Sequence, residues 1–393
     1  MTIFLTSVDN PYSDEVGGKH THLLLLEKGL KEIGCGVEYF YPRPPIDKLK
    51  NFAEGNNKNI KPIKNFLKNS VFYLFFLIKK NNEKLSLIKD FLEEHNQFDV
   101  CNAHDVVALL AVRKFKGKKV LTLHGYYARE LISDIKNPIL RFFLFNYAFS
   151  LERRAIRIAD SIIAVDDRIK EYLIAKFKYN PSDIHVVFNA VDTDAFSPIS
   201  LDKQYKNRSK LGFSSQDFIA LIPRRLVKKN GVIYAVQALG KIVDRRIKII
   251  VIGDGPEMDA LKAYAQEDRR LALLGSVPHK KINSYYLISD VVIVPSITTG
   301  GIQEATSISM LEGMSCGKVV ICSKIGGMEQ VINSGVNGIL VEEKNSTAIA
   351  TAITSLKDDV EKRASIAKNA REYVLKFHSY KKHAETILGV YMG

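Results

Sequence analysis

Two glutamates eight residues apart give this sequence its most informative chemical pattern. Glu304 and Glu312 stand in P-S-I-T-T-G-G-I-Q-E-A-T-S-I-S-M-L-E-G-M-S-C-G, residues 295–317. On one helix, two turns would separate them by about 12 Å on nearly the same face. We expect Glu304 at or before the helix start, so that each carboxylate could hold one end of a ligand and free amides near 306–308 an anion between them. The alternative is that both glutamates lie on the surface. The apolar residues of the helix indicate that it is largely buried, however, and buried carboxylates need partners.

A basic cluster follows the apolar run 218–223, which we expect to be a strand. Residues 222–231 read I-P-R-R-L-V-K-K-N-G. Arginine offers a two-pronged contact and lysine a compact charge, so the cluster could neutralise a diphosphate. A solvated basic loop is the alternative. The position after a strand favours the anion site, because ligands of open α/β sheets bind at the carboxyl ends of strands.

Histidines follow two other expected strands. The run 120–124 ends in His124, which is a candidate for ligand contact by the same argument about strand ends, with a hydrogen-bonded structural role as the alternative. His104 also stands just past a strand and is interpreted as structural.

Glycines at two turns could let phosphates approach the backbone. Gly17 and Gly18 precede an expected helix over 21–33, whose N-terminus would favour an anion, and Gly253 opens G-D-G-P after another expected strand. A plain turn explains either pattern equally well. Neither is G-x-G-x-x-G or a P-loop, which argues against a dehydrogenase or an ATPase.

Short apolar runs alternate with helical stretches and must position these residues. Most runs are rich in valine and isoleucine and apolar on both faces, as buried parallel strands are. The expected strands are 2–8, 37–41, 98–103, 120–124, 161–165 and 185–188, then 218–223, 248–252, 271–275, 291–295, 319–322 and 339–341. The alternation predicts an α/β fold of two doubly wound domains, and turn formers at 189–198 mark the boundary.

Composition bounds the function without deciding it. A chain of 393 residues suits two domains, and a net charge of +14 favours anionic partners: nucleic acid, an acidic membrane surface or a phosphorylated substrate. The longest apolar run, 71–78, is too short to span a bilayer, and the N-terminus shows no signal-peptide pattern. The four cysteines form no zinc pattern, so reduced thiols and a cytoplasmic location are expected.

One segment departs from the alternating plan. Between Asp47 and Gln97 the chain makes a long connection, and its part from Lys58 to Lys80 contains six lysines and no acid. A helix that packs on the core with solvated lysines is one interpretation. The other is an amphipathic face that meets anionic lipid or a lipid-linked acceptor.

Taken together, the motifs resemble family 4 retaining glycosyltransferases of the GT-B fold. The resembling pieces are G-G-K-H at 17–20, L-T-L-H-G at 121–125, F-N-A-V-D at 188–192, R-R-L-V-K-K-N-G at 224–231, G-D-G-P at 253–256, P-S at 295–296 and E-A-T-S-I-S-M-L-E at 304–312. The resemblance implies two Rossmann-like domains that face a central cleft. Residues 1–193 would bind the acceptor, residues 194–378 the nucleotide sugar, and the C-terminal helix in 379–393 would pack back on the first domain.

The resemblance also implies residue roles. Glu312 would bind the ribose and Glu304 a hydroxyl of the donor sugar, while His124 would lie beside the transferred sugar. Arg225 and Lys229 would hold the diphosphate. Gly17, Gly18, Gly253 and the amides of Ser307 and Ile308 would complete the donor site.

Two departures and one false lead qualify these roles. The family commonly has lysine directly before the glycine of the basic motif, where this chain has Asn230, so Lys228 is the second choice after Lys229. Ala305-Thr306-Ser307 replaces the usual Gly-Phe-Gly. Asp192 and Asp194 form a D-x-D like the metal-holding motif of other glycosyltransferases, but they lie in an interdomain turn that the family carries without metal.

The implied activity transfers a hexose or N-acetylhexosamine from a nucleoside-diphosphate sugar, with UDP preferred, to an acceptor hydroxyl. The acceptor would be a cell-surface glycan, a lipid-linked glycan or a small molecule. The reaction would need no metal and no cofactor, and no nucleic acid would be a partner. The enzyme would act in the cytoplasm or at the inner membrane surface. Three alternatives remain: a GT-B sugar-nucleotide epimerase, a non-catalytic surface or coat protein on this fold, and a nucleic-acid binder, which would show one continuous basic face with aromatics.

Overall fold

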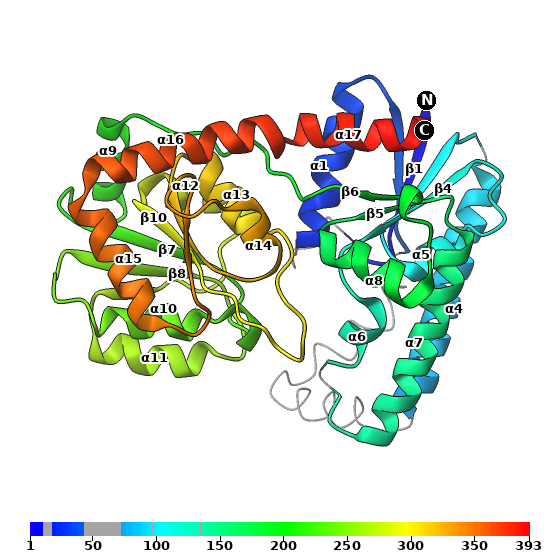
Figure 1. The fold of residues 1–393 in the computed structure, drawn as a ribbon, viewed down its shortest axis with the longest axis horizontal. Helices are drawn as coiled ribbons and strands as arrows, with labels where there is room; N and C mark the ends of the chain where they lie inside the picture. Colours follow the sequence, from blue (N-terminus) through cyan, green and yellow to red (C-terminus); the bar gives the residue numbers. More distant parts are fainter. Residues whose placement is uncertain (11–17, 43–71, 96, 134) are drawn as a thin grey trace. The chain divides into compact units, whose positions relative to one another are not determined.

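The protein is described by a computed structural model that covers residues 1–10, 18–42, 72–95, 97–133 and 135–393. It divides into two compact units (Figure 1). Unit 1 comprises residues 1–187 and 384–393, and unit 2 comprises residues 188–383. Part of the lysine-rich segment, residues 58–71, lies outside the described residues, as does Gly17.

Unit 1 is built on a six-stranded parallel sheet of order β2-β1-β3-β4-β5-β6. The strands are β1 (Thr2–Thr6), β2 (Gly36–Phe40), β3 (Val100–Ala103), β4 (Lys118–Leu123), β5 (Ser161–Ala164) and β6 (Ile184–Val186). The helices are α1 (Gly18–Glu32), α4 (Phe72–Glu94), α5 (Val106–Ala111), α6 (Tyr127–Leu131), α7 (Pro138–Ile158) and α8 (Asp167–Phe177), and the last helix, α17 (Tyr380–Met392), ends in this unit.

Unit 2 repeats the plan with the order β12-β11-β10-β7-β8-β9. The strands are β7 (Phe218–Pro223), β8 (Ile247–Ile252), β9 (Leu271–Leu273), β10 (Val291–Val294), β11 (Val319–Ser323) and β12 (Ile339–Val341). The helices are α9 (Leu201–Lys210), α10 (Val232–Leu239), α11 (Met258–Glu267), α12 (His279–Ile288), α13 (Ile308–Ser315), α14 (Gly326–Val331), α15 (Ser346–Asp358) and α16 (Val360–Phe377).

Both faces of the second sheet are buried, which explains its continuous apolar strands. In β8, Ile249 and Val251 belong to one core cluster, while Ile250 and Ile252 belong to the cluster on the other face. Successive side chains of a strand point to opposite faces, so helices must cover the sheet on both sides. The predicted pair of doubly wound α/β sheets is thereby confirmed.

No helix among the described residues combines the length and apolar character needed to cross a bilayer.

Candidate functional site

In unit 2, three loops meet beyond the carboxyl ends of neighbouring strands. They follow β7, β8 and β10, the strands at the centre of the sheet. Ile297 donates its backbone N–H to the carbonyl of Lys229 over 2.8 Å, and Leu226 donates to Asp254 over 2.9 Å. A Cβ at Gly253 would lie 2.0 Å from the carbonyl oxygen of Arg224, so the glycine permits this close backbone approach.

At this edge of the sheet, the side chain of Arg224 contacts residues of the loops after β7 and β10 and of the start of α13. Its Nη2 lies 3.1 Å from Oε2 of Glu304 and donates to Oγ of Ser296 over 2.9 Å. Its Nη1 donates to Oγ of Ser307 over 3.0 Å, and Nη2 also reaches Oδ1 of Asn230 over 2.8 Å. The side chain is only 8% exposed. A buried guanidinium needs such a set of acceptors, and in return it fixes their positions.

The other basic residues of the same loop are exposed. Arg225, Lys228 and Lys229 all present their side chains to solvent. Asn230, where the family commonly has lysine, is buried and donates its side-chain amide to the carbonyl of Arg225 over 2.8 Å. The loop therefore holds one cation inside, against Glu304, and leaves three available to an anionic ligand.

Glu312 is buried in the middle of α13 and is held by two residues of α12. Its Oε1 lies 2.8 Å from Nε2 of His279, and its Oε2 accepts a hydrogen bond of 2.6 Å from the hydroxyl of Tyr286. The hydrogen bond to Glu312 raises the pKa of His279, against the opposing effect of burial. Burial, and after it the carboxylate, raises the pKa of Tyr286. The two contacts fix the position of the Glu312 carboxylate within α13.

The start of α13 faces the loop after β7. Oγ of Ser309 donates to the carbonyl of Pro223 over 2.9 Å, and the carbonyl of Glu304 accepts from the N–H of Gly327 over 3.1 Å. The first amides of a helix have no partner within it and carry partial positive charge. The amides of Ser307 and Ile308 thus belong to the same edge of the sheet as the exposed cations.

In unit 1, three histidines converge at the carboxyl edge of the sheet. Nδ1 of His104 lies 3.2 Å from Nε2 of His124, and the ring of His22 from α1 packs edge-on against His124 at 4.7 Å between centroids. One ligand nitrogen from each histidine lies within 4.8 Å of the others. A contact of 3.2 Å between two imidazoles is a hydrogen bond in which one ring donates and the other accepts. We therefore interpret the cluster as a hydrogen-bonded histidine network that orients His124.

A partly exposed group of charges is formed by residues that neighbour these histidines in the sequence. Lys19, the second residue of α1, contacts Asp9 over 2.8 Å and Asp105 over 3.5 Å. Burial alone would lower the pKa of Lys19, but the two carboxylates outweigh it and raise the pKa. Gly18 stands exposed at the helix start.

The aspartates of the D-x-D pattern are engaged elsewhere in unit 2. Oδ1 of Asp192 accepts from the backbone N–H groups of Asp194 and Ala195 over 3.1 and 3.0 Å. Oδ2 of Asp194 accepts from the hydroxyl of Tyr380 over 2.9 Å. Side-chain-to-backbone bonds of this kind are typical of a turn.

Two family models match successive parts of the chain. "Glycosyltransferase Family 4" covers residues 16–195 and "Glycosyl transferases group 1" covers residues 203–373. The chain belongs to glycosyltransferase family 4. It is 24% identical, over 95% of its length and 96% of the relative's, to a UDP-Gal:alpha-D-GlcNAc-diphosphoundecaprenol alpha-1,3-galactosyltransferase of Escherichia coli.

Solved structures of other glycosyltransferases resemble this structure over the whole length of the chain. Sucrose-phosphate synthase of Thermosynechococcus elongatus superposes with a TM-score of 0.77 at 19% identity, covering 100% of this chain and 98% of the other. Anabaena HepE in complex with UDP and glucose gives a TM-score of 0.70 at 20% identity, covering 100% and 99%. The chain thus has the predicted GT-B fold.

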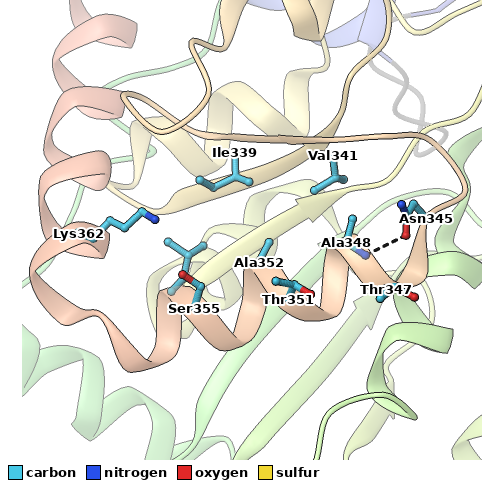
Figure 2. A pocket seen from close by; sticks show the side chains of 10 residues that line it. Ile339, Val341, Asn345, Thr347, Ala348, Thr351, Ala352, Ser355 and Lys362 are labelled. Atoms are coloured by element: carbon cyan, nitrogen blue, oxygen red, sulfur yellow. Dashed lines mark hydrogen bonds between the residues drawn. The ribbon is translucent and has the colours of Figure 1, made fainter.

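One hollow of the glycosyltransferase lies apart from these motifs. It has a volume of about 500 Å³ between β12 and α15, where Ile339 and Val341 face Ala348 and Ala352, and Lys362 lies at one end (Figure 2). None of its lining residues belongs to the predicted donor site. We interpret it as an open groove between a strand and its covering helix.

Within unit 2, the structure brings together Arg225, Lys229, Gly253, Glu304, Ser307 and Ile308 at one edge. His124 and Gly18 lie in unit 1. Sequence patterns missed Arg224 as the link to Glu304, and His279 and Tyr286 as the partners of Glu312. They also missed the contact between His104 and His124, since the structural role expected of His104 named no partner for it. The one available signal was that both histidines directly follow neighbouring parallel strands.

Proposed function

We propose that this glycosyltransferase transfers a hexose or N-acetylhexosamine from a UDP-sugar to an acceptor hydroxyl with retention of the anomeric configuration. One observation carries the proposal: Arg224 holds Glu304 beside the first turn of α13 and the exposed cations of the β7 loop. UDP is chosen because Anabaena HepE was solved with UDP and glucose. In this proposal unit 2 binds the donor and unit 1 the acceptor.

The chemistry requires stabilisation of charge on the departing diphosphate. Arg225, Lys229 and the first amides of α13 would surround its oxygens, and fixed dipoles and cations act most strongly where water is excluded. The leaving phosphate can take the proton of the acceptor hydroxyl on the same face of the sugar, which accounts for retention without a separate base. Glu304 would bind a hydroxyl of the sugar, and Glu312 the ribose.

The acceptor proposed here is a lipid-linked or cell-surface glycan. The Escherichia coli relative is named for an acceptor linked to diphosphoundecaprenol. Such an acceptor would place the enzyme on the cytoplasmic side of the membrane, as a peripheral protein. The net charge of +14 favours binding to a phosphate-bearing acceptor in an anionic membrane.

The test is a thermal-shift screen of UDP, GDP, ADP and their sugars, followed by turnover of the sugar that stabilises most. A ligand at 100 times its dissociation constant adds about 2.7 kcal/mol, a shift that melting curves resolve easily. NMR of the product should show the anomeric configuration of the donor. An inverted product would refute retention, and conversion of the donor without any acceptor would favour the epimerase.

A further inference from the structure

Five large apolar side chains of unit 1 are exposed on the first turns of two helices. Phe75 and Phe76 in α4 are 66% and 59% exposed. Ile139, Phe142 and Phe143 in α7 are 67%, 65% and 54% exposed. Scattered exposed apolar residues need no explanation, but a contiguous group of this size marks an interaction surface.

The two groups belong to one surface because the helices pack against each other. Ile139, Phe142 and Phe143 follow the i, i+3, i+4 spacing that places side chains on one helix face. Beneath them, Leu140 and Leu144 pack against partly buried residues of the first turns of α4. Further along, Asn81 of α4 donates to the hydroxyl of Tyr147 of α7 over 3.2 Å. Figure 1 shows α4 and α7 side by side, with these first turns away from the sheet.

The charged side chains of these two first-turn segments are basic. Residues 72–82 and 135–151 contain no carboxylate. Lys79, Lys80 and Arg141 are exposed there. In α4 the two lysines stand one turn after the two phenylalanines, so cations flank the apolar stripe. A second copy of the chain would bring like charges together, whereas an anionic lipid surface neutralises the cations and accommodates the aromatic rings.

We propose that the first turns of α4 and α7 form a docking surface for an anionic phospholipid bilayer. Ile139, Phe142, Phe143, Phe75 and Phe76 insert at the level of the headgroups, and the three cations contact lipid phosphates. This surface is the membrane contact that the proposed lipid-linked acceptor calls for. Binding to lipid is measured without donor or acceptor, so its failure and that of the glycosyl transfer are distinguishable.

Co-sedimentation of the full chain with vesicles tests the surface. The wild type should bind vesicles of phosphatidylglycerol and phosphatidylcholine in equal parts, bind pure phosphatidylcholine weakly, and release as salt rises from about 0.1 M to about 0.5 M. Phe142→Ser/Phe143→Ser should lower partitioning into the vesicles at least about tenfold, since burial of each ring in the bilayer contributes strongly to the free energy of binding. Lys79→Gln/Lys80→Gln should lower it about fivefold per lysine on the anionic vesicles.

Matched controls exchange equally exposed apolar residues in unit 2. Leu201→Ser and Val360→Ser alter side chains that are 65% and 59% exposed and should leave vesicle binding unchanged. Melting temperatures of all variants should equal that of the wild type, because only exposed side chains change. Absence of binding to anionic vesicles, or undiminished binding by the double phenylalanine variant, would overturn the proposal. So would a dimer in light scattering that Phe142→Ser/Phe143→Ser dissociates.

Discussion

Arg224 contacts four protein groups at once, and we expect it to act on the donor through Glu304. Arg224→Lys keeps the charge but cannot reproduce the planar fork that reaches Glu304, Ser296 and Ser307. Loss of hydrogen bonds to a charged group costs about 1.5–3 kcal/mol, so kcat should fall roughly 10- to 100-fold.

Calorimetry with UDP separates this positioning role from direct binding. Arg224→Lys should leave UDP affinity nearly unchanged, whereas Arg225→Ala, which removes an exposed cation, should weaken it. Equal losses of UDP affinity in the two variants would mean that Arg224 contacts the diphosphate itself.

Glu304 and Glu312 should respond differently to replacement. Glu312→Gln should weaken binding of UDP and UDP-sugar alike, by about 1–3 kcal/mol, because the ribose that Glu312 is proposed to bind does not react. Glu304→Gln mainly lowers kcat, because an anion beside the sugar helps a transition state that gains positive charge. The measurements are calorimetry with UDP and steady-state kinetics, with the exposed Glu342→Gln as control. Normal UDP affinity and kcat in both glutamate variants would place the donor site elsewhere.

Turnover should persist in excess EDTA after metal stripping. In the proposed donor site, Arg225 and Lys229 would supply the positive charge that a metal would bring to the diphosphate. The carboxylates of Asp192 and Asp194 are engaged in a turn and by Tyr380. The assay compares initial rates before and after stripping. A complete loss of turnover that magnesium or manganese restores would contradict metal independence; restoration by zinc alone would instead make His22, His104 and His124 the ligands.

Residue types and spacing sufficed to place Glu304, Glu312 and the basic loop among the candidates. They could not identify Arg224 as the partner of Glu304, because two adjacent arginines look alike until the backbone turns one inward and one outward. The partners of Glu312 were hidden for a similar reason. His279 and Tyr286 stand on α12, far from Glu312 in sequence, and only packing brings them together.

At the scale of elements, α7 and α8 are joined by a buried carboxyl group that should make stability depend on pH. Burial raises the pKa of Glu152 to about 7, although the hydroxyl of Tyr172 donates to it over 3.0 Å. The native state therefore keeps a proton that the unfolded chain releases near its ordinary pKa of 4.5. This contribution to stability is fully present below pH 4.5 and is lost as pH rises through 7.

Glu152→Gln removes this titration and keeps an acceptor for Tyr172. Relative to the wild type, the variant should gain about 1–3 kcal/mol between pH 4.5 and pH 8. Melting temperatures at the two pH values measure the gain, with the exposed Glu171→Gln as control. A difference from the wild type that is the same at both pH values would contradict the shifted pKa.

The strands were predictable because their apolar character is continuous on both faces. Their ends were less so: the run expected over 98–103 forms a strand only from Val100, and that over 271–275 only to Leu273. Helix α7 was not among the helices expected from the sequence. Its first turns expose Ile139, Phe142 and Phe143 as well as burying Leu140 and Leu144, so the polar face that marks an ordinary surface helix is interrupted there.

At the scale of the whole molecule, the end of the chain completes the core of unit 1. After unit 2, residues 384–393 return to unit 1, where Ile387 and Tyr391 pack with Ile3 and Leu5. The hydroxyl of Tyr391 accepts a hydrogen bond of 2.6 Å from Asn102. Helix α17 thus contributes to the core around β1, and we expect the stability of unit 1 to depend on a segment that follows unit 2 in the chain.

Tyr391→Ala should lower the stability of unit 1 by about 3–5 kcal/mol, the usual cost of removing a buried aromatic ring. Hydrogen exchange followed by mass spectrometry locates the effect: protection should fall in β1, β3 and β4 and stay unchanged in β7, β8 and β10. Met392→Ala, at a neighbouring position that is 71% exposed, should alter neither sheet. Equal loss of protection in both sheets would show that the units unfold as one, and unchanged protection in β1 would show that this sheet does not rely on the end of the chain.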